Sequence, residues 1–413
     1  MLPDCGGTLT NERRCRMIAT ILALAVIPIA LPALSLLILT LAALFEDSRP
    51  SNRTELAQAP GVRIAVLVPA HNESANVLPT IECLHRQLGP QDRLLVIADN
   101  CDDDTAELAR AAGALVIERK NLELRGKGYA LACGVDHLRA DPPDVVLVVD
   151  ADCIVSDGAV ACIAQRCRST GKPVQMLNLM SAGTDAGLKF RVLEFAMLMK
   201  NLVRPLGSFR LGGACHLMGT GMALPWSLMS TAKLATGHVT EDMKLGVDLA
   251  MAGYAPQFLP QVRVSSAFPQ DSGVAKVQKS RWEHGHLATL TEELPGLAAA
   301  ALKSGRASLI VMTMDLMIPP VALYFMVLGV AAVFSLVAAA FWPVWQLAAT
   351  VVCLAALSFG VAIGLAWFRF GRHLLSAREL LSTPLYALWK VPVYLAYFLK
   401  KRSGWVRTKR DSE

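Results

Sequence analysis

The sequence predicts an α/β domain, with a mostly parallel sheet covered by helices on both faces, flanked by transmembrane helices. Two observations support this fold class. Short apolar runs alternate with helix-like stretches through the middle of the chain, and long, almost uncharged blocks lie toward its two ends. Of the 413 residues, 54% are hydrophobic and 18% are charged, whereas an average soluble domain has about 25% charged residues.

The predicted domain occupies residues 61–295, and its expected strands are apolar runs that end in polar residues. These runs are residues 64–69, 94–99, 114–118 and 145–150, and helix-like stretches at 76–87 and 105–112 separate some of them. Strands that are apolar throughout are typical of a parallel sheet buried on both faces, and ligands bind beyond the carboxyl ends of such strands. We therefore expect a nucleotide near Asp99, Asp150 and the run Pro69-Ala70-His71-Asn72-Glu73.

An uncharged stretch near the N-terminus predicts a transmembrane helix over residues 17–45. A helical span needs about 20 apolar residues, and the apolar core of a signal peptide runs only to about 15 residues. Pro28 and Pro32 are expected to kink this helix without breaking it. A basic segment, residues 1–16, precedes the helix, and a linker, residues 46–60, follows it.

A second apolar block, which contains a single charged residue, predicts transmembrane helices over residues 309–340 and 345–368. The proline-containing aromatic run between them is expected at a membrane interface, and residues 296–308 link the block to the domain. Residues 380–399 have positive charge at both ends, which favours an interfacial helix over a third C-terminal membrane helix. A basic cytoplasmic tail, residues 400–413, is expected after it.

The charge and cysteine content exclude several classes of protein. Forty basic residues against 34 acidic ones give a net charge of +6, which is too small and too scattered for a nucleic-acid binder. The 10 cysteines form no C-x-x-C pair. We therefore expect reduced, separately packed thiols in a cytosolic setting, and neither a disulfide framework nor a zinc site.

Asp150 and Asp152 stand two residues apart, just beyond the last expected strand. Carboxylate oxygens at this spacing suit a hard divalent cation such as Mg²⁺ or Mn²⁺. Such a cation would neutralise a diphosphate and stabilise it as a leaving group. The alternative is a strand end that is simply capped by acidic turn residues.

Two further acidic clusters each precede or begin a predicted helix. In the run 99–104 most carboxylates are expected to cap the helix, whereas Asp99, at the strand end, is a candidate for accepting a hydrogen bond from the imide of a base. In Thr240-Glu241-Asp242, capping is again the simpler interpretation. The functional alternative is a general base that takes the proton from an acceptor hydroxyl.

The run Gln278-Lys279-Ser280-Arg281-Trp282 combines an arginine, which pairs with phosphate, with a tryptophan, on which a sugar ring can stack. An interfacial membrane anchor is the alternative, because the second apolar block follows. His284 and His286 come next, and no cysteine lies near them. We expect these histidines to pack or to contact an acceptor rather than to bind a metal.

Together and in this order, the motifs resemble the family 2 glycosyltransferases, especially the membrane-embedded branch that contains cellulose, hyaluronan and chitin-oligosaccharide synthases. The resemblance covers about residues 60–290. It rests on a P-x-Y-N-E-like motif at 69–73, with His71 where a tyrosine is frequent, an aspartate at 99, D-x-D at 150–152, T-E-D at 240–242 and Q-x-x-R-W at 278–282. It implies a GT-A fold, which is Rossmann-like, and an inverting transfer from a nucleotide-diphospho-sugar, most often one linked to UDP.

The resemblance also implies a role for each candidate site residue. Asp242, with Glu241 beside it, would be the catalytic base. Asp152 would bind Mg²⁺ or Mn²⁺, and Asp150 would face the metal or the ribose. The expected substrate contacts are Glu73, Asp99 and Lys127 for the base and ribose, Arg281 for the diphosphate, Trp282 for the acceptor sugar, Thr220 in an acceptor-side loop at 219–221, and Pro69, His71 and Gln278 within their motifs.

The resulting prediction is a hexosyl- or N-acetylhexosaminyltransferase of the inner (plasma) membrane, with its catalytic domain facing the cytoplasm. It would act on a saccharide or lipid-linked saccharide in exopolysaccharide or cell-envelope glycan synthesis, with polysaccharide-export proteins as candidate partners. One alternative is a processive synthase that extrudes a homopolymer, which the small number of visible spans disfavours. The other is a retired nucleotide-sugar-binding subunit, which the intact Asp152, Asp242, Arg281 and Trp282 disfavour.

The orientation of the first span stays open. Arg13, Arg14 and Arg16 favour a cytoplasmic N-terminus by the positive-inside rule. A cytoplasmic catalytic domain requires instead that the N-terminus lie outside, or that the first apolar stretch be a re-entrant hairpin. Arg369 and Arg372 place the end of the last span on the cytoplasmic side.

Overall fold

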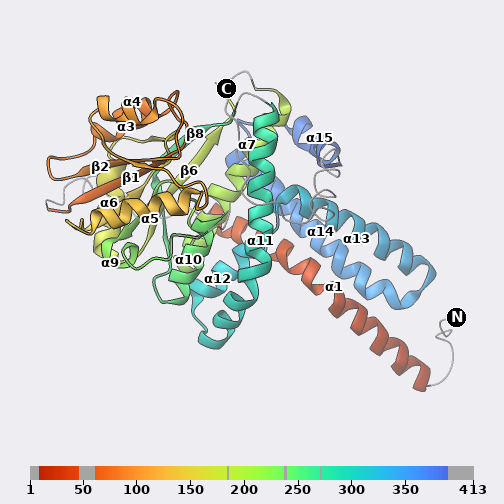
Figure 1. Ribbon diagram of the computed structural model, residues 1–413. Coiled ribbons are helices and arrows are strands. Elements are labelled where there is room, and N and C mark those ends of the chain that lie inside the picture. The colour runs from red at the N-terminus through yellow and green to blue at the C-terminus, as the bar shows by residue number, and fades with distance from the viewer. Residues whose placement is uncertain (1–8, 46–60, 184–185, 237–239, 270–271, 389–413) are drawn as a thin grey trace.

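The computed structural model describes residues 9–45, 61–183, 186–236, 240–269 and 272–388. In this part of the chain an α/β domain is built around one sheet, and three long helices project from one side of it (Figure 1). The expected fold class, an α/β domain flanked by apolar helices, is confirmed.

Eight strands of the described residues form the sheet, and their spatial order differs from their order along the chain. In spatial order they are β3 (Leu115–Arg119), β2 (Arg93–Asp99), β1 (Ile64–Ala70), β4 (Val145–Val148), β7 (Met222–Pro225), β6 (Val174–Ser181), β8 (Gln257–Ala267) and β5 (Ile154–Val155). β1 pairs in parallel with both β2 and β4, so that Val66 lies opposite Leu94 and Leu147. The strand order reverses between β1 and β4, and this reversal opens a crevice at their carboxyl ends.

The four strands expected from the sequence are β1 to β4, and they pair in parallel with one another, as β6 and β8 do in the other half of the sheet. β7 runs antiparallel to both β4 and β6, and β5 runs antiparallel to β8, so the whole sheet is mixed. β6 carries the buried polar residues Gln175 and Asn178. These interrupt the apolar pattern by which a buried strand is recognised, which is why β6 was not expected.

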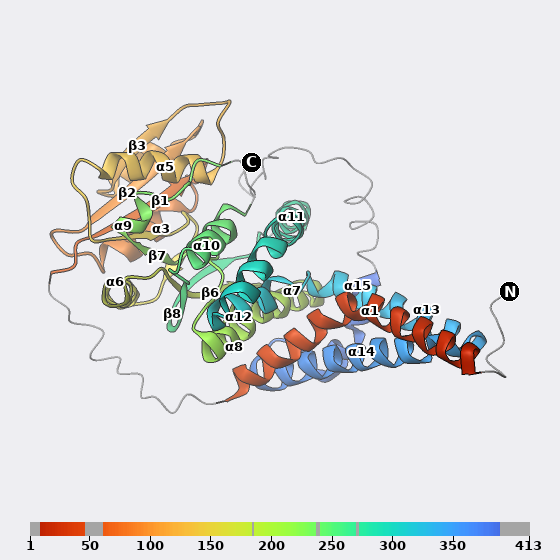
Figure 2. The same cartoon turned by 90° about the horizontal axis from the view of Figure 1, so that it is seen from below.

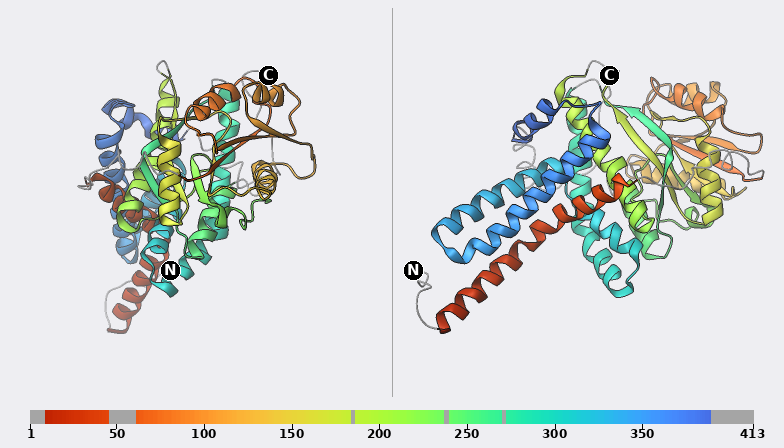
Figure 3. Two further views of the ribbon diagram at one scale, coloured as in Figure 1. Left: turned by 90° about the vertical axis from the view of Figure 1, so that its left-hand side faces the viewer. Right: turned by 180° about the vertical axis from the view of Figure 1, so that it is seen from behind.

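Helices cover both faces of the sheet because the central strands are apolar on both sides. Val66 and Val68 of β1 pack with α3, α4 and α6, whereas Ala65 and Leu67 pack with α5, α9 and α10. The bounds of these helices are α3 (Val77–His85), α4 (Thr105–Ala111), α5 (Lys127–Leu138), α6 (Ala159–Thr170), α9 (Trp226–Met229) and α10 (Glu241–Met251). The right-hand view of Figure 3 shows this domain on one side of the molecule and the long helices on the other.

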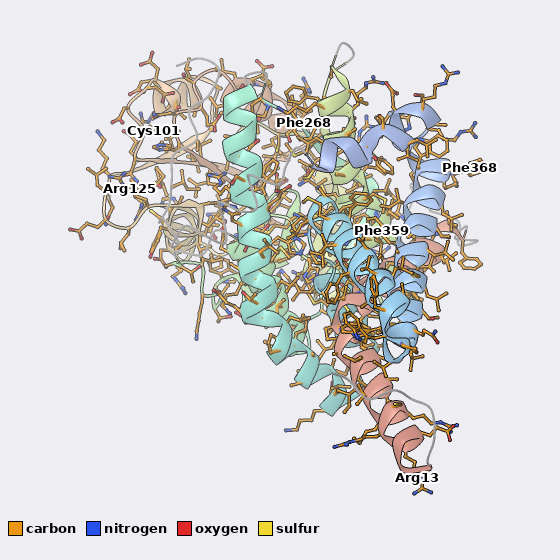
Figure 4. All side chains as sticks on the ribbon, turned by 90° about the vertical axis from the view of Figure 1, so that its right-hand side faces the viewer. Arg13, Cys101, Arg125, Phe268, Phe359 and Phe368 are labelled. Carbon is orange, nitrogen blue, oxygen red and sulfur yellow. The ribbon has the colours of Figure 1, made fainter. Side chains whose placement is uncertain are left out.

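Three helices of the described residues are long and apolar enough to cross a membrane. They are Glu12–Leu44 within α1 (Leu9–Leu44), α13 (Val321–Phe341), and Pro343–Gly371, which joins η2 (Pro343–Trp345), α14 (Gln346–Ala366) and η3 (Trp367–Gly371). The N-terminal end of α1 and the turn between α13 and α14 lie at the same end, away from the α/β domain (Figure 2). Figure 4 likewise shows Arg13 far from Arg125 and Cys101, which belong to that domain.

α1 continues through Pro28 and Pro32 as a single helix, so the re-entrant hairpin considered from the sequence is not observed. The hydroxyl of Tyr324 in α13 donates a hydrogen bond of 2.6 Å to the carbonyl of Ile29, between the two prolines. A side chain from a neighbouring helix therefore supports the backbone where proline weakens it.

A second group of helices joins the α/β domain to the long helices. It comprises α7 (Leu188–Leu198), the π-helical turn η1 (Met199–Val203), α8 (Arg204–Gly212), α11 (Ser272–Ser304), α12 (Ala307–Leu316) and α15 (Ala377–Leu388). α8 packs directly on α1, since a Cβ atom added to Gly207 would lie 2.1 Å from the carbonyl oxygen of Leu39. Nη1 of Arg210 donates to the carbonyls of Ala42 and Ala43 in the last turn of α1, at 3.1 and 2.7 Å.

Several observed boundaries differ from the expected segments. The expected helix over 309–340 is divided into α12 and α13, because Pro319 and Pro320 cannot continue a helix and restrict the residue before them. α11 runs to Ser304 and so includes much of the expected linker 296–308. α15 covers the first part of the segment 380–399, while residues 389–413, like residues 1–8 and 46–60, lie outside the described residues.

The expectation of reduced cysteines holds for most but not all of the described ones. Cys83, Cys101, Cys133, Cys153, Cys162, Cys167, Cys215 and Cys353 carry free thiols. Cys15, at the N-terminal end of α1, is disulfide-bonded, which corrects the expectation for that residue.

Gly207→Ala should lower the melting temperature of the detergent-purified protein by several degrees. The added methyl group would force α8 away from the backbone of α1, and overpacking of this kind costs about 1–3 kcal/mol. Gly296→Ala in α11 is the matched control, because its Cβ would meet no atom within 4 Å, and it should keep or slightly raise the melting temperature. Equal melting temperatures for the wild type and Gly207→Ala would contradict the close packing of α8 on α1.

Candidate active site

A pocket of about 750 Å³ opens at the carboxyl ends of the parallel strands. It is the place where all the site residues expected from the sequence meet. These residues are Pro69, His71, Glu73, Asp99, Lys127, Asp150, Asp152, Thr220, Glu241, Asp242, Gln278, Arg281 and Trp282. They come from strand ends, loops and helices that are up to about two hundred residues apart in the sequence, so the fold itself assembles the set.

One end of the pocket is formed by the loops that follow β1 and β2, and two asparagines shape these loops. Asn72 and Asn100 both have φ of 54°, in the left-handed region that few residues other than glycine adopt. The side-chain oxygen of Asn72 accepts a hydrogen bond from the backbone N–H of Asp102, at 2.9 Å. That of Asn100 accepts from the backbone N–H of Asn121, at 2.7 Å, so each loop is held by a segment beyond the next strand.

Asp99 and His71 lie between these loops, and both are engaged by neighbours. The Asp99 carboxylate forms an ion pair with Arg119 of β3. The ring of His71 donates from Nδ1 to the backbone carbonyl of Asp99, at 2.7 Å. Glu73 is buried, and its side chain accepts a hydrogen bond from Asn76 at 3.1 Å. The pairing with Arg119 leaves Asp99 less free to bind a base than the sequence alone suggests.

Lys127, the first residue of α5, is the central cation of the pocket. Its ammonium group forms an ion pair with Asp150 and donates a hydrogen bond of 2.9 Å to the carbonyl of Gly219. Burial alone would lower the pKa of Lys127, but the charges of Asp150, Glu241 and Asp242 outweigh it and raise that pKa above its usual value. Lys127 therefore stays protonated and offsets part of the negative charge around it.

Asp150, Asp152 and Cys153 form a candidate metal centre at the end of β4. Their potential ligand atoms all lie within 4.8 Å of one another. Cys153 is buried, whereas Asp150 and Asp152 are both partly exposed, so the two carboxylates are the ligands that open to the pocket. An all-oxygen ligand pair suits Mg²⁺ or Mn²⁺, so the residues present fit the expected ion. Lys127 already pairs with Asp150, which leaves Asp152 as the stronger ligand.

Glu241 and Asp242 begin α10 on the other side of Lys127. Burial raises the pKa of both, and the charge of Asp242 adds to the effect on Glu241, whose pKa rises to about 7. The simpler interpretation of this motif, a threonine cap, does not describe the structure. Thr240 makes no capping hydrogen bond, and its hydroxyl instead contacts the Thr289 hydroxyl of α11 at 2.6 Å.

The loop from 219 to 221 brings backbone close to these charged groups. A Cβ atom at Gly219 would lie 3.2 Å from Oδ2 of Asp242 and 3.3 Å from Nζ of Lys127, so glycine is what leaves room for both side chains. Thr220 is buried, and its hydroxyl accepts a hydrogen bond from the backbone N–H of Asp150 at 3.1 Å. The loop thus binds the backbone of Asp150 and leaves room for the side chains of Asp242 and Lys127.

Gln278, Arg281 and Trp282 line the pocket from α11. Trp282 packs beside a small cluster of apolar side chains that includes Leu193, Phe268 and Met180. This placement favours the binding interpretation of the motif over an interfacial membrane anchor. His284 contacts the Ser280 hydroxyl at 3.4 Å, whereas His286 is buried and reaches the pocket.

The pocket also contains charged and polar residues that the sequence analysis did not select. They include Lys200, Arg204, His216 and Asp315, together with His286, for which acceptor contact was one expectation. None of them belongs to a run with a recognisable motif. Of these residues, Asp315 had a sequence feature that could have indicated a functional role, because it is the single charged residue in the second apolar block.

Comparisons with known proteins agree with this geometry. The family model described as "Glycosyltransferase like family 2" matches residues 60–285. The chain is 25% identical over 264 residues to "Probable glycosyltransferase YdaM" of Bacillus subtilis (strain 168), and this match covers 59% of each chain. It is 22% identical over 250 residues to "N-acetylglucosaminyltransferase" of Rhizobium leguminosarum bv. viciae, and this match covers 57% of this chain and 58% of the relative. The match therefore spans less than two thirds of the length of either relative.

Among solved structures, the mannosyltransferase PcManGT from Pyrobaculum calidifontis, in complex with GDP-Man and Mn²⁺, is similar to this chain with a TM-score of 0.53. The identity is 15%, and the superposition covers 94% of this chain and 100% of that chain. At this identity the likeness shows a shared fold.

The raised pKa of Glu241 predicts that stability falls as pH rises. Its pKa is about 7 in the folded protein against an ordinary value of 4.5, so the folded state holds the proton more tightly. The resulting stabilisation is fully present below pH 4.5, is lost as pH rises through 7, and amounts to at most about 3 kcal/mol. Glu241→Gln removes this dependence, so its melting temperature should exceed that of the wild type at pH 8 and fall less between pH 5 and 8.

The measurement is a melting curve of the detergent-purified protein in EDTA at several pH values. Glu107→Gln, at an exposed position of α4, serves as the control and should follow the wild type. Parallel pH dependences for Glu241→Gln and the wild type would exclude Glu241 as the titrating group.

Proposed function

The chain belongs to the glycosyltransferase like family 2, and we propose that it transfers a sugar, with inversion, from a nucleotide-diphospho-sugar to a saccharide or lipid-linked saccharide. The donor class that we propose is a UDP-hexose or UDP-N-acetylhexosamine. One observation carries the proposal: a single pocket holds the carboxylate pair at 150 and 152 and the half-buried carboxylate of Asp242, and Lys127 pairs with Asp150 and is close enough to Asp242 for that charge to raise its pKa. Transfer at an anomeric carbon needs this pairing of a site for the leaving group and a base.

In the proposed reaction, Asp242 takes the proton of an acceptor hydroxyl as the oxygen attacks the anomeric carbon. The new bond joins that carbon to the acceptor oxygen, and the bond to the diphosphate breaks on the opposite side. The raised pKa of Asp242 makes it a stronger base than an exposed aspartate. A single carboxylate base suits one in-line displacement, whereas a retaining double displacement uses a second carboxylate as nucleophile.

The leaving diphosphate requires positive charge on its side of the pocket. Mg²⁺ or Mn²⁺, when bound by Asp152 and Asp150, supplies such charge. Arg281 is proposed to pair with the diphosphate, and Lys127 holds Asp150 in place. Trp282, with its ring packed beside the Phe268 cluster, is proposed to stack on the acceptor sugar.

We propose that α1, α13 and α14 cross the inner (plasma) membrane and that the catalytic domain faces the cytoplasm, where nucleotide-sugars are made. Because α1 is one continuous helix whose C-terminal end meets α8, this topology places the N-terminus outside despite Arg13, Arg14 and Arg16. The placement brings the pocket next to the bilayer, which suits an acceptor carried by a lipid and a role in exopolysaccharide or envelope-glycan synthesis.

Asp242→Asn should reduce sugar transfer at least about 100-fold and leave nucleotide affinity nearly unchanged, because it removes the base and keeps the shape of the side chain. The assay is release of nucleoside diphosphate by detergent-purified protein with a panel of nucleotide-sugars, alongside calorimetry with UDP. Asp248→Asn, on the same helix but outside the pocket, is the control and should keep full activity. Wild-type turnover in Asp242→Asn would remove Asp242 from the role of base.

Asp152→Ala should weaken UDP binding in the presence of Mn²⁺ at least about tenfold and bring it to the level that the wild type shows in EDTA. Calorimetric titration with UDP, with and without Mn²⁺, measures both. Asp157→Ala, a nearby exposed aspartate, should behave as the wild type. Equal UDP affinity of the wild type with Mn²⁺ and with EDTA would rule out the metal centre.

A further inference from the structure

The inner part of the pocket, next to α8 and α12, is a cluster of nitrogen-bearing side chains. Lys200, Arg204, His216 and His286 all line the pocket there, with Asp315 as the accompanying carboxylate. Lys200 and Arg204 come from η1 and from α8, which follows it directly, whereas His216 comes from the segment before β7 and His286 from α11. The fold therefore brings together side chains from three separate parts of the chain. The proposed reaction uses none of them.

Arg204 and Asp315 fix each other in place. Nε of Arg204 donates to Oδ1 of Asp315 at 2.6 Å, and Nη2 donates to the Asp315 carbonyl at 2.7 Å. Both side chains are about 95% buried, so this is an internal ion pair. Asp315 therefore balances the charge of Arg204 and leaves that of Lys200 without a paired carboxylate among the described residues.

The two histidines are buried, and three of their four ring nitrogens have no hydrogen-bond partner among the described residues. His216 is 6% exposed and His286 is 4% exposed. Neither ring nitrogen of His216, nor Nε2 of His286, has a hydrogen-bond partner within the part of the chain that the structure describes. Oδ2 of Asp315 lies 3.6 Å from Nε2 of His216, which is too long for a hydrogen bond. Buried polar groups are normally satisfied, so these nitrogens point to a missing ligand.

The charges around the histidines indicate the sign of the charge that the ligand carries. Burial lowers the pKa of both histidines, and the neighbouring charges of Lys200 and Arg204 lower that of His286 further. With the histidines neutral, the charges of Lys200, Arg204 and Asp315 leave one net positive charge, which disfavours a cation, and the carboxylate of Asp242 also acts on Lys200. The opposite end of the pocket is acidic, since Glu73, Asp99, Asp102, Asp150 and Asp152 line it.

Lys200 lies in a π-helical turn, which helps to bring the side chains of this cluster to the pocket. η1, from Met199 to Val203, inserts a π-helical turn between α7 and α8. Such turns place an extra residue in a helix and redirect the side chains around it. Here Lys200, Asn201 and Arg204 all line the pocket from this turn or directly after it.

The cluster lies against the helices that are proposed to cross the membrane. Residues of α12 and the segment after it, Val311 and Ile318, share an apolar cluster with Leu36 and Leu39 of α1. Lys200 is also close enough to Asp242 for each to shift the pKa of the other. A ligand held here would lie beside the proposed base and next to the bilayer.

We propose that Lys200, His216 and His286, supported by the Arg204–Asp315 pair, bind the phosphate group of a lipid-borne acceptor and hold its reacting end near Asp242. A phosphate offers several acceptor oxygens and up to two negative charges, which match unpaired donors converging from separate elements. This proposal deepens the proposed function and rests on it for the role of the bound molecule as acceptor.

The test uses farnesyl phosphate and farnesol, which differ only in the phosphate group, and inorganic phosphate as the free anion. Binding is measured by calorimetry on the full-length detergent-purified protein saturated with UDP and Mn²⁺, so that the diphosphate site is already filled. We expect farnesyl phosphate to bind at least about tenfold more tightly than either farnesol or inorganic phosphate. Lys200→Met and His286→Gln should each weaken farnesyl phosphate at least about tenfold, and Lys233→Met, at an exposed position outside the pocket, should not.

Each outcome decides a different point. Retained UDP binding in Lys200→Met and His286→Gln shows that these variants are folded. If UDP binds to the wild type but farnesyl phosphate does not bind, or binds no better than farnesol, the phosphate subsite is wrong while the proposed transferase stands. If inorganic phosphate binds as tightly as farnesyl phosphate, the ligand is a free anion and the lipid source is wrong. If the wild type fails to bind UDP with Mn²⁺, the proposed donor fails, and the same ligands titrated without nucleotide then judge the subsite by whether Lys200→Met and His286→Gln lose farnesyl phosphate binding that Lys233→Met keeps.

Discussion

The contacts of the Lys127 ammonium group allow the pocket to exist in its observed form. Asp150, Glu241 and Asp242 would repel one another in this partly buried site, and Lys127 lies where it attracts all three. Its hydrogen bond to the Gly219 carbonyl also ties the first turn of α5 to the loop before β7. One side chain thus connects three separate parts of the fold, and the positions of both the candidate metal ligands and the candidate base depend on it.

The second structural dependence is that of the pocket on the long helices. α8 contacts α1 so closely that only glycine fits at 207, and Arg210 binds the carbonyls that end α1. The same α8 begins with Arg204, which lies in the pocket wall and pairs with Asp315 of α12. The helices of membrane-spanning length are therefore part of the construction of the pocket, and not merely an anchor attached by a linker.

Sequence reasoning recovered the features that depend on local patterns. β1 to β4 were predictable because their residues are apolar on both faces, and the donor-side residues were predictable because they follow those strands directly. β6 was not predicted because its buried polar residues interrupt the apolar pattern, and β7 was not predicted because its short apolar run ends at Pro225 and Trp226 with no polar residue at the strand end. Lys200, His216 and Asp315 escaped for a different reason: each looks ordinary in its own segment, and only the packing of α8, α11 and α12 brings them together.

The two left-handed asparagines have a consequence for how the protein is made. Asn72 is held by Asp102 and Asn100 by Asn121, so neither loop can be stabilised until the chain has extended past its partner. The lining of the pocket then continues to Asp315. Contacts so distant in sequence form late, whereas the backbone hydrogen bonds of α1 join residues four apart within Leu9–Leu44. On the ribosome, the N-terminal helix therefore emerges long before the nascent chain can assemble a complete binding site.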